Sequence, residues 1–376
     1  MRPPLRVVAA SAPWVLGTML LAACAATSSG PGPVTRTYYI AADEVPWDYV
    51  PGSVDQITGL AYTDTAYFKV GKPRPVTTTY LKTLYREYTD SSFGTLKPRP
   101  PEWRHLGFLG PVIRGVVGDT IRVVFRNNGK QPYSVHPHGV FYGKESEGAP
   151  YVDGTQGADK ADDGVPPGGT HVYTWFVPER AGPGPMDGSS IIWMYHSHVD
   201  ETRDVNTGLV GPLIVTARGK ARADGTPVDV DRELVTAYVQ VHEEHSWNAA
   251  VNLPRGADST AIANPHQLQN IYPWFVQFSI NGYTHGALPL EALTIRKGQR
   301  VRWYVFASTN DFDGHSPHWH GNTVLVNQMR TDVLNLPTMG MMVADMVPDD
   351  IGTWLYHCHI SMHLEAGMQA RYAVVQ

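Results

Sequence analysis

The sequence predicts an all-β chain made of two Greek-key β-sandwich domains, and three observations support this fold class. Gly and Pro are abundant, at 36 and 30 of 376 residues, and the apolar runs between them are short, as in a chain of strands and turns. Several segments alternate apolar and polar residues, which is the period of a half-buried strand. The outline also repeats after roughly 160 residues, as expected for two similar sandwiches. Each copy has a Gly-punctuated strand, a His-rich motif, and a second His-rich motif that closes on a strand.

Residues 1–36 are predicted to be a leader and a flexible tether. Two Arg residues precede an apolar run that is too short, and too interrupted by Pro, to favour a membrane-spanning helix over an export signal. The sequence Leu-Ala-Ala-Cys at 21–24 is typical of lipoprotein processing, which would leave a lipid on Cys24. The alternative is ordinary cleavage among the small residues 22–26, with loss of Cys24. Both interpretations predict an exported protein, either secreted or periplasmic, or held at the cell surface through that lipid alone.

The rest of the chain is predicted to divide at a polar linker. Residues 219–233 are rich in charge and contain Gly and Pro, so domain 1 is expected at 37–218 and domain 2 at 234–376. Helix should be scarce in both. The clearest strand patterns lie at 120–126, 171–177, 234–241, 291–306 and 369–375.

The segment HCHISMHLEAGM at 357–368 carries the ligands of a blue-copper site. Cys358, His363 and Met368 supply a thiolate, an imidazole and a weak thioether, and one more His would complete the set. If the Cys lies on a strand, its two neighbours, His357 and His359, face the other way, toward a second metal site. The arrangement indicates electron transfer from one metal centre to another.

Further His-rich segments provide the ligands of that second site. Each His pair at i, i+2 puts two imidazoles on one face of an extended segment. The pairs are His136 with His138, His196 with His198, His318 with His320, and His357 with His359. These imidazoles match three copper ions, two with three His each and one with two. His315 then remains as the second His of the blue site.

Cysteine use and charge agree with a copper protein. Apart from Cys24, the chain contains only Cys358, and an exported protein with one unpaired thiol needs a reason to keep it, which metal coordination supplies. The net charge of −5 is mild and no basic patch stands out, so nucleic acid is not an expected partner.

With these residues in place, the chain resembles the multicopper oxidases, and within them the ceruloplasmin-like branch. The resemblance covers nearly all of the chain after the leader and rests on five segments besides the HCH motif. They are YYIAADEVPWDY (38–49), LYREYTDSSFGT (84–95), LGFLGPVIRGVVGDTIRVVFRN (106–127), HPHGVFYGKESEGAPY (136–151) and YHSHVDETRDVNTGLVGPLIV (195–215). The resemblance implies cupredoxin-type sandwiches. It also implies a reaction in which single electrons enter at a blue copper and dioxygen becomes two waters at a trinuclear cluster.

The resemblance also implies a role for each ligand, with four copper ions per chain. The type 1 (blue) copper would be held by His315, Cys358, His363 and Met368. The type 2 copper would be held by His136 and His318. One type 3 copper would take His138, His196 and His359, and the other His198, His320 and His357. Electrons would pass from Cys358 through His357 and His359.

The two repeats differ at one position that decides where the blue copper lies. Cys358 of the second repeat corresponds to Ser197 of the first, and Ser cannot replace a soft thiolate, so only domain 2 should hold a blue site. Each domain supplies half of the cluster His. In two-domain members of the family the facing domains come from neighbouring chains. We therefore predict a homotrimer with its clusters between subunits, with a monomer as the alternative.

The reductant is predicted to be a phenolic or other aromatic compound, as in laccases. Met362 stands where ceruloplasmin-like ferroxidases have an acidic residue, and Pro273 and Phe278 stand where they have a Glu and a His. An apolar rim of the blue site would suit an organic ring. The rim candidates are Trp274, Phe275, Phe278, Trp319 and Met362. The alternative is an oxidase of Fe(II) or Cu(I), for which Asp311 and Asp313 offer carboxylates and the Met residues offer thioethers.

Reduction of dioxygen to water also consumes protons, so a carboxylate near the cluster is expected, and Asp153 is the candidate. Two other classes of protein fit the His pattern less well. A copper nitrite reductase has one type 2 copper and needs no paired type 3 His. A non-catalytic copper-binding lipoprotein would need no ligand set matched to both kinds of centre.

Overall fold

A computed structural model describes residues 32–62, 77–252, 276–308 and 314–376. The predicted leader up to residue 31, Cys24 and the predicted positions 273–275, Asp311 and Asp313 lie outside these ranges. Within the described residues, no helix is long and apolar enough to cross a membrane.

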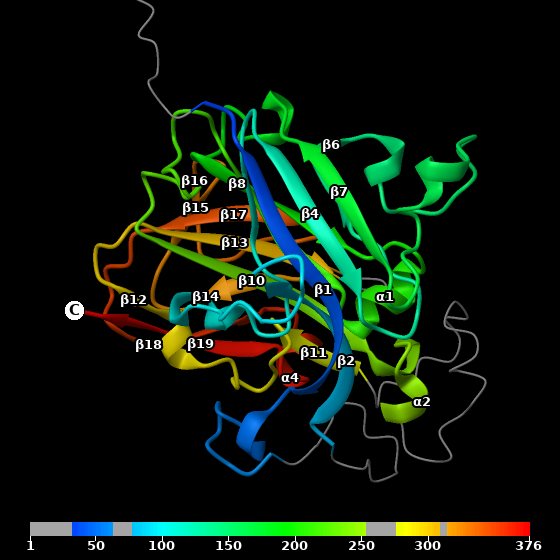
Figure 1. Ribbon diagram of the computed structural model, residues 1–376. Helices are drawn as coiled ribbons and strands as arrows, with labels where there is room; N and C mark the ends of the chain where they lie inside the picture. Colours follow the sequence, from blue (N-terminus) through cyan, green and yellow to red (C-terminus); the bar gives the residue numbers. More distant parts are fainter. Residues whose placement is uncertain (1–31, 63–76, 253–275, 309–313) are drawn as a thin grey trace, which may run out of the picture.

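The first half of the chain forms two curled sheets (Figure 1). One has the strand order β2-β1-β4-β7-β6 and the other β3-β9-β8-β5. Their strands are β1 (Thr35–Asp48), β2 (Thr79–Tyr88), β3 (Ile113–Val116), β4 (Thr120–Asn127), β5 (His136–Pro137), β6 (Phe141–Tyr142), β7 (Thr170–Phe176), β8 (Ser190–His196) and β9 (Val210–Thr216).

The second half repeats this plan, with the orders β11-β10-β13-β17-β15-β16 and β12-β19-β18-β14. Its strands are β10 (Arg232–His242), β11 (Val276–Ile280), β12 (Thr294–Arg296), β13 (Val301–Ser308), β14 (Pro317–Trp319), β15 (Val324–Val326), β16 (Met329–Thr331), β17 (Met341–Met346), β18 (Gly352–Cys358) and β19 (Gln369–Val375). The parallel pair β1–β4 corresponds to β10–β13, and β3–β9 corresponds to β12–β19. The predicted all-β fold and its internal repeat are confirmed.

Helices are short and lie between strands. Among the described residues the α-helices are α1 (Glu201–Thr207), α2 (Ala249–Asn252) and α4 (Ser361–Glu365). The 3-10 turns are η1 (Pro51–Ser53), η2 (Pro101–Leu106), η3 (Lys144–Ser146), η4 (Gly157–Lys160), η5 (Glu179–Ala181), η6 (Glu243–His245) and η9 (Leu290–Leu293).

One strand prediction was wrong. The pattern at 291–306 predicts a single strand, but the chain forms η9, then β12, then β13, and the two strands belong to different sheets. The break falls at Gly298, whose φ of 76° is a left-handed turn conformation that glycine adopts readily. The predicted edges of the linker also shift slightly, because β10 already begins at Arg232.

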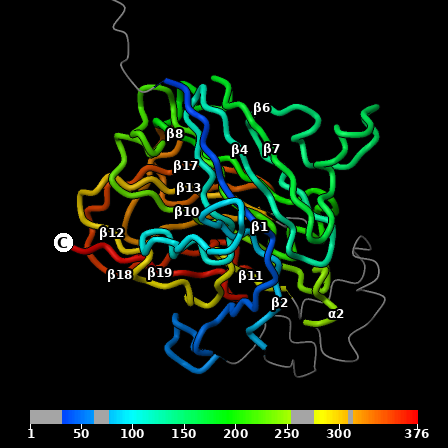
Figure 2. Tube along the Cα trace, viewed as in Figure 1, coloured from blue at the N-terminus to red at the C-terminus, as the bar shows by residue number. Residues whose placement is uncertain are grey.

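Strand β10 joins the two halves because it is buried on both faces. Its odd-numbered residues, such as Val239 and Val241, share a core with Leu84 and Met194 of the first half. Its even-numbered residues turn toward the second half, where Tyr238 belongs to the other core. Every residue of β10 from Glu233 to His242 is buried, as expected for a strand that is covered on both faces. Figure 2 shows β10 running through the middle of the molecule.

A buried ion pair also links the halves. The Arg114 guanidinium on β3 donates to both carboxylate oxygens of Glu233 on β10, at 3.0 and 2.7 Å. The two side chains are only 10% and 9% exposed, and Tyr304 donates to the same carboxylate at 2.9 Å.

Replacing Arg114 by Met should therefore destabilise the fold strongly. The change leaves the Glu233 carboxylate buried without its cation, which costs about 3–5 kcal/mol. Urea unfolding measures the loss. The control is Lys130→Met, because Lys130 pairs with Glu44 at the surface with 71% of its side chain exposed, and its loss should stay below about 1 kcal/mol. Equal losses in the two variants would contradict this assignment.

Candidate metal centres

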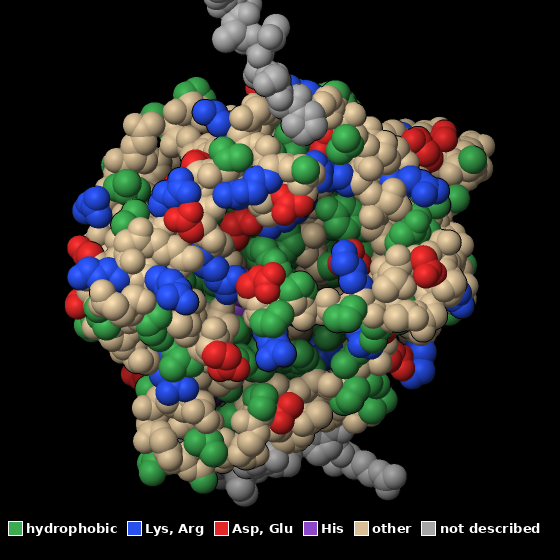
Figure 3. Space-filling view, turned by 60° about the vertical axis from the view of Figure 1, so that its left-hand side comes forward, with side chains coloured by type: hydrophobic (Ala, Val, Ile, Leu, Met, Phe, Trp, Pro, Cys, Tyr) green, Lys and Arg blue, Asp and Glu red, His purple; other side chains and the backbone are tan. Residues whose placement is uncertain are grey.

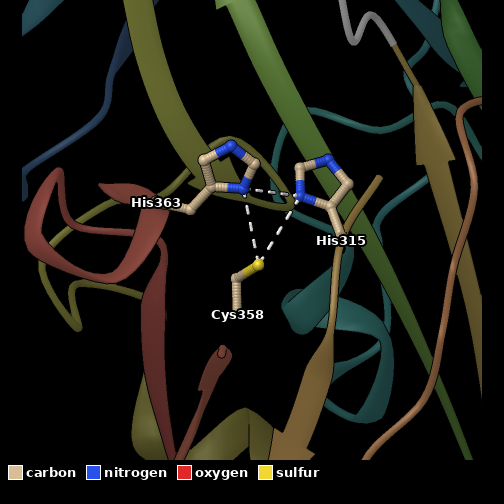
Figure 4. A group of neighbouring side chains, drawn as sticks. All are labelled: His315, Cys358 and His363. Carbon is tan, nitrogen blue, oxygen red and sulfur yellow. Dashed lines mark hydrogen bonds between the residues drawn. The ribbon is translucent and has the colours of Figure 1, made fainter. Parts of the chain in front are cut away.

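Three donor atoms of the second half converge at one buried point (Figure 4). His315 lies just before β14, Cys358 ends β18, and His363 lies in α4. The Nδ1 atoms of the two imidazoles are 3.2 Å apart, and the Cys358 Sγ lies 3.4 Å from His363 Nδ1 and 3.8 Å from His315 Nδ1. All three side chains are at most 1% exposed. A thiolate and two imidazoles in a dry pocket are the donor set of a blue-copper site.

The surroundings keep these donors ready to bind a metal. Burial, together with the nearby His363, lowers the pKa of His315 to about 3, so its ring is neutral and its lone pair available. The Ser316 N–H donates to Cys358 Sγ at 3.3 Å, and the far nitrogen of the His363 ring lies 2.8 Å from the Gln240 amide nitrogen. Such contacts fix the orientation of a metal ligand. The predicted fourth ligand, Met368, is fully buried and its carbonyl accepts from the Cys358 N–H at 3.1 Å.

The matching place in the first half contains a different set of side chains. The Ser197 N–H donates to the Leu209 carbonyl at 3.1 Å, so Ser197 corresponds to Cys358 and Leu209 to Met368. The Ser197 hydroxyl donates to the Asp204 carboxylate at 2.6 Å. A hydrogen-bond network therefore replaces the soft donors there.

Four imidazoles of the first half form one cluster. β5 pairs with β8 so that His136 lies opposite His196, and the rings of His136, His138, His196 and His198 are all within 5.1–5.6 Å of a neighbour. The Nε2 atoms of His138 and His196 are 3.1 Å apart. Two imidazole nitrogens at this distance could both bind one metal ion.

Four imidazoles of the second half form a matching cluster. β14 pairs with β18 so that His318 lies opposite His357, and the Nε2 atoms of His320 and His357 are 3.0 Å apart. His359 follows β18, with its ring 5.1 Å from the His318 ring. One ligand atom each of His318, His320 and His357 lie within 4.8 Å of one another.

Backbone carbonyls hold these rings in the orientation that metal binding needs. The Nδ1–H of His136 donates to the Glu147 carbonyl at 2.7 Å, and that of His318 donates to the Asp332 carbonyl at 2.9 Å. His196 and His357 make the same bond to the carbonyl of the next residue, at 3.0 and 2.8 Å. Because a carbonyl only accepts, each Nδ1 carries the proton and each Nε2 keeps its lone pair.

The two imidazole clusters are separate within one chain. All eight His lie in the part of the chain that the structure describes, yet no ring contact or hydrogen bond joins a His of the first half to one of the second. Most of these rings are partly exposed, and His359 is exposed. Each imidazole cluster therefore reaches the surface.

Comparisons with known proteins indicate one family for this chain. Two family models, both described as multicopper oxidase, match residues 106–220 and 255–376. The chain is 40% identical to mouse "Ferroxidase HEPHL1" over 352 residues, which is 91% of this chain and 29% of that protein.

The chain belongs to the multicopper oxidase family.

It resembles the ceruloplasmin branch in particular. Identity to human ceruloplasmin is 36% over 361 residues, which is 92% of this chain and 33% of ceruloplasmin. The chain thus spans about a third of the length of these relatives. The solved structure of a blue copper oxidase from Nitrosomonas europaea is similar in fold, with a TM-score of 0.56 and a sequence identity of 16%. The match covers 90% of this chain and 86% of that one. The predicted cupredoxin fold is confirmed.

The predicted rim of the blue site is only partly described. The Phe278 ring lies 5.1 Å from the His363 ring, so this residue borders the group formed by His315, Cys358 and His363. Met362 is half-buried on α4 beside it. The placement of Trp319 was wrong: it is 1% exposed and packs against Trp303 in the core, because β14 turns this side chain inward while its neighbouring His face the cluster.

Two carboxylates, Asp153 and Asp204, are candidates for a proton-transfer role near the imidazole clusters. Asp153 lies 3.0 and 2.9 Å from the ammonium groups of Lys144 and Lys160, and hydrogen bonds from Thr155 and the lysines hold its pKa far below the usual range. Asp204 was not singled out from the sequence. It accepts from Ser197, which lies between His196 and His198, and burial raises its pKa to about 6.

A cavity of about 680 Å³ lies elsewhere in the first half, between β2 and η2. None of the predicted copper ligands lines it. Its aromatic side chains include Trp47, Trp103 and Phe108, and its basic residues include Arg86 and Arg99. On the face that Figure 3 shows, basic and acidic side chains are interspersed rather than gathered by sign.

Proposed function

We propose that this chain is a copper-dependent oxidase that takes single electrons from a reductant and reduces dioxygen to two waters. The observation that carries the proposal is the placement of Cys358 between His357 and His359, with the thiolate in one donor set and both imidazoles in the other. When bound, copper would supply one-electron chemistry at the His–Cys centre and dioxygen reduction at the imidazole cluster. His315, Cys358, His363 and Met368 would hold the first, and the paired His would hold the second.

The protein chain supplies the connection between these centres. A covalent path leads from Cys358 Sγ through its main chain to the neighbouring imidazoles, with no gap to cross. The Nδ1 bonds to carbonyls keep the cluster rings aimed, and burial excludes water from the thiolate. This rigid arrangement favours electron transfer that needs little rearrangement of the ligands.

We propose that the imidazole clusters are completed between subunits of a homotrimer. Each chain has two imidazole clusters, one in each half, that do not meet, and each cluster reaches the surface. We call these two clusters half-sites. A first-half cluster facing a second-half cluster of the next chain gives a head-to-tail contact, which closes into a ring. The relatives, about three times as long as this chain, support three copies.

We propose Fe(II) as the reductant, because a relative with 40% identity is named a ferroxidase. A phenolic reductant is the second candidate, supported by the apolar Phe278 beside His363 and by Met362 in place of an acid. Dioxygen uptake by the copper-loaded protein separates them when Fe(II), Cu(I) and a methoxyphenol are compared side by side. Fastest uptake with Fe(II) supports the first candidate, and fastest uptake with the phenol overturns it.

Copper nitrite reductase and a non-catalytic copper-binding lipoprotein fit the paired clusters less well. A nitrite reductase needs no type 3 His, and a storage protein needs no thiolate joined to an imidazole cluster. We further propose that the protein is exported, with any membrane attachment made through Cys24.

We propose that Asp204, rather than Asp153, supports proton delivery to the cluster. Its pKa of about 6 lies close to neutral pH, where a carboxyl can both give and take a proton. Asp204→Asn should lower dioxygen turnover by about 10–100-fold, the usual effect of losing a group that supports metal ligands. Asp153→Asn should change the rate less than about twofold. Steady-state dioxygen uptake measures the rates of both variants. A large loss in Asp153→Asn with little change in Asp204→Asn would favour Asp153, the residue predicted from the sequence.

A further inference from the structure

The even-numbered side chains of β10 follow one another toward and past the blue site. The Thr236 hydroxyl lies 2.8 Å from the Tyr356 hydroxyl, and the Tyr238 ring lies 5.5 Å from the His315 ring. Gln240 comes next, with its amide nitrogen 2.8 Å from the outer nitrogen of the His363 ring. His242 therefore lies one further step along the same face, about 6.6 Å along the strand from Gln240.

A cluster of buried titratable side chains begins at that step. His242 ends β10, and Glu243, Glu244 and His245 form η6 directly after it. All four are at most 7% exposed. Glu243 is accounted for by structure alone, because Lys82 and Tyr49 donate to its carboxylate at 2.9 and 2.8 Å.

The Glu244 carboxylate, in contrast, is not fully paired by hydrogen bonds. One of its oxygens lies 3.2 Å from His242 Nδ1. The other oxygen is buried and has no hydrogen-bond partner among the described residues. The His245 ring stacks on the His242 ring, with centroids 5.2 Å apart and planes at 14°. A buried carboxylate oxygen without a partner is costly, and an ion is one of the few groups that satisfies it.

We propose that His242, Glu244 and His245 form a binding site for a divalent first-row metal ion, Fe(II) in the working enzyme. Two imidazoles and one carboxylate are a donor set that suits Fe(II). Coordination needs the His245 ring to turn out of its stack, so that its nitrogen meets the atoms of His242 and Glu244. The Glu244 carboxylate offsets part of the charge of the cation.

This site would replace the iron ligands that the chain lacks at Pro273, Phe278 and Met362. Its role as the substrate site rests on the proposed function. Fe(II) would lose one electron there and become Fe(III), and dioxygen would be the final oxidant. The path to the blue site runs from His242 along β10 to Gln240 and the His363 ring.

Cobalt(II) titration of the copper-loaded protein tests the site, because Co(II) binds imidazole and carboxylate and its visible bands report them. We expect a Co(II) site whose affinity falls by at least about tenfold in Glu244→Gln and in His245→Gln. The matched control is Glu291→Gln, an exposed acid of the same half, which should bind as the parent does. Unchanged blue absorption shows that each variant is folded.

Steady-state kinetics then test the metal site at Glu244 separately from the proposed oxidation of Fe(II). Glu244→Gln should raise the KM for Fe(II) by about tenfold and leave methoxyphenol oxidation unchanged. The proposed site is overturned if Co(II) does not bind, if it binds equally well to Glu244→Gln, or if that variant oxidises Fe(II) with the parent KM. If Co(II) binding depends on Glu244 but the parent does not oxidise Fe(II), the metal site stands and the proposed reductant fails.

Discussion

Mixing two inactive variants is expected to restore about a quarter of the parent dioxygen uptake. The variants are His138→Ala, which damages the first-half cluster, and His320→Ala, which damages the second-half cluster. Each alone should be inactive, since every interface of its homotrimer pairs one broken half-site with an intact one. The two Nε2–Nε2 contacts of 3.1 and 3.0 Å place these residues at the centre of their half-sites.

The expected fraction follows from ring closure. Random assembly from equal amounts puts both variants into about three of every four trimers. In each mixed trimer, roughly one interface of three joins the intact first half of one variant to the intact second half of the other. That second half also contains its own undamaged Cys358. Co-expression of the two variants with different tags, followed by oxygen-electrode measurement, gives the fraction.

A matched mixture controls for non-specific effects. His138→Ala and His196→Ala both damage the first-half cluster, so their mixture has no interface with two intact halves and should stay inactive. Recovery in that mixture, or no recovery with His138→Ala and His320→Ala, would contradict clusters built between subunits. A monomer that contains the whole cluster predicts no recovery in either mixture.

Replacing Cys358 by Ser should remove the blue absorption and reduce dioxygen uptake to background. The hydroxyl is a hard donor that does not replace the thiolate, so the protein should bind one copper fewer than the roughly four expected per chain. The fold should persist, because Ser197 already occupies the matching place in the first half. There the Ser134 N–H donates to the Ser197 hydroxyl at 3.0 Å, as the Ser316 N–H donates to Cys358 Sγ at 3.3 Å.

Met368→Leu is the matched variant for this experiment. Leu209 stands at the corresponding place in the first half, so the core accepts Leu at this position. The axial thioether is a weak ligand that tunes the potential of a blue site, so copper and blue absorption should remain. Absorption spectra and copper analysis of both variants decide the point. Blue absorption in Cys358→Ser would contradict the assignment of the thiolate.

The sequence was sufficient to predict the fold class because its strands are locally encoded. β7 alternates in burial along its length, and β4 does so except at Val124, which is buried like its neighbours. The error at 291–306 arose because strand-like apolar residues lie on both sides of the polar stretch 296–300, and the backbone turn at Gly298 separates strands that pack in different sheets. Local patterns do not reveal such a change of sheet.

The metal ligands were predictable because they lie close together in the sequence. The His pairs are two residues apart, and Cys358 and His363 are five apart, so spacing alone indicates their chemistry. Gln240 and Asp204 were not predictable in this way. Gln240 is 123 residues from His363 in the chain, so its contact is only visible once β10 lies beside α4. Asp204 is only seven residues from Ser197, but no spacing pattern marks it, and its contact is only visible once α1 lies against Ser197.

The most direct test of the account is the number of electrons consumed for each dioxygen by the copper-loaded protein. The measurement combines an oxygen electrode with a count of oxidised substrate, using the faster of Fe(II) and a methoxyphenol. The account predicts about four electrons per dioxygen and no hydrogen peroxide, because a complete imidazole cluster carries the reduction to water. A ratio near two with peroxide released, or no dioxygen uptake at all, would contradict it.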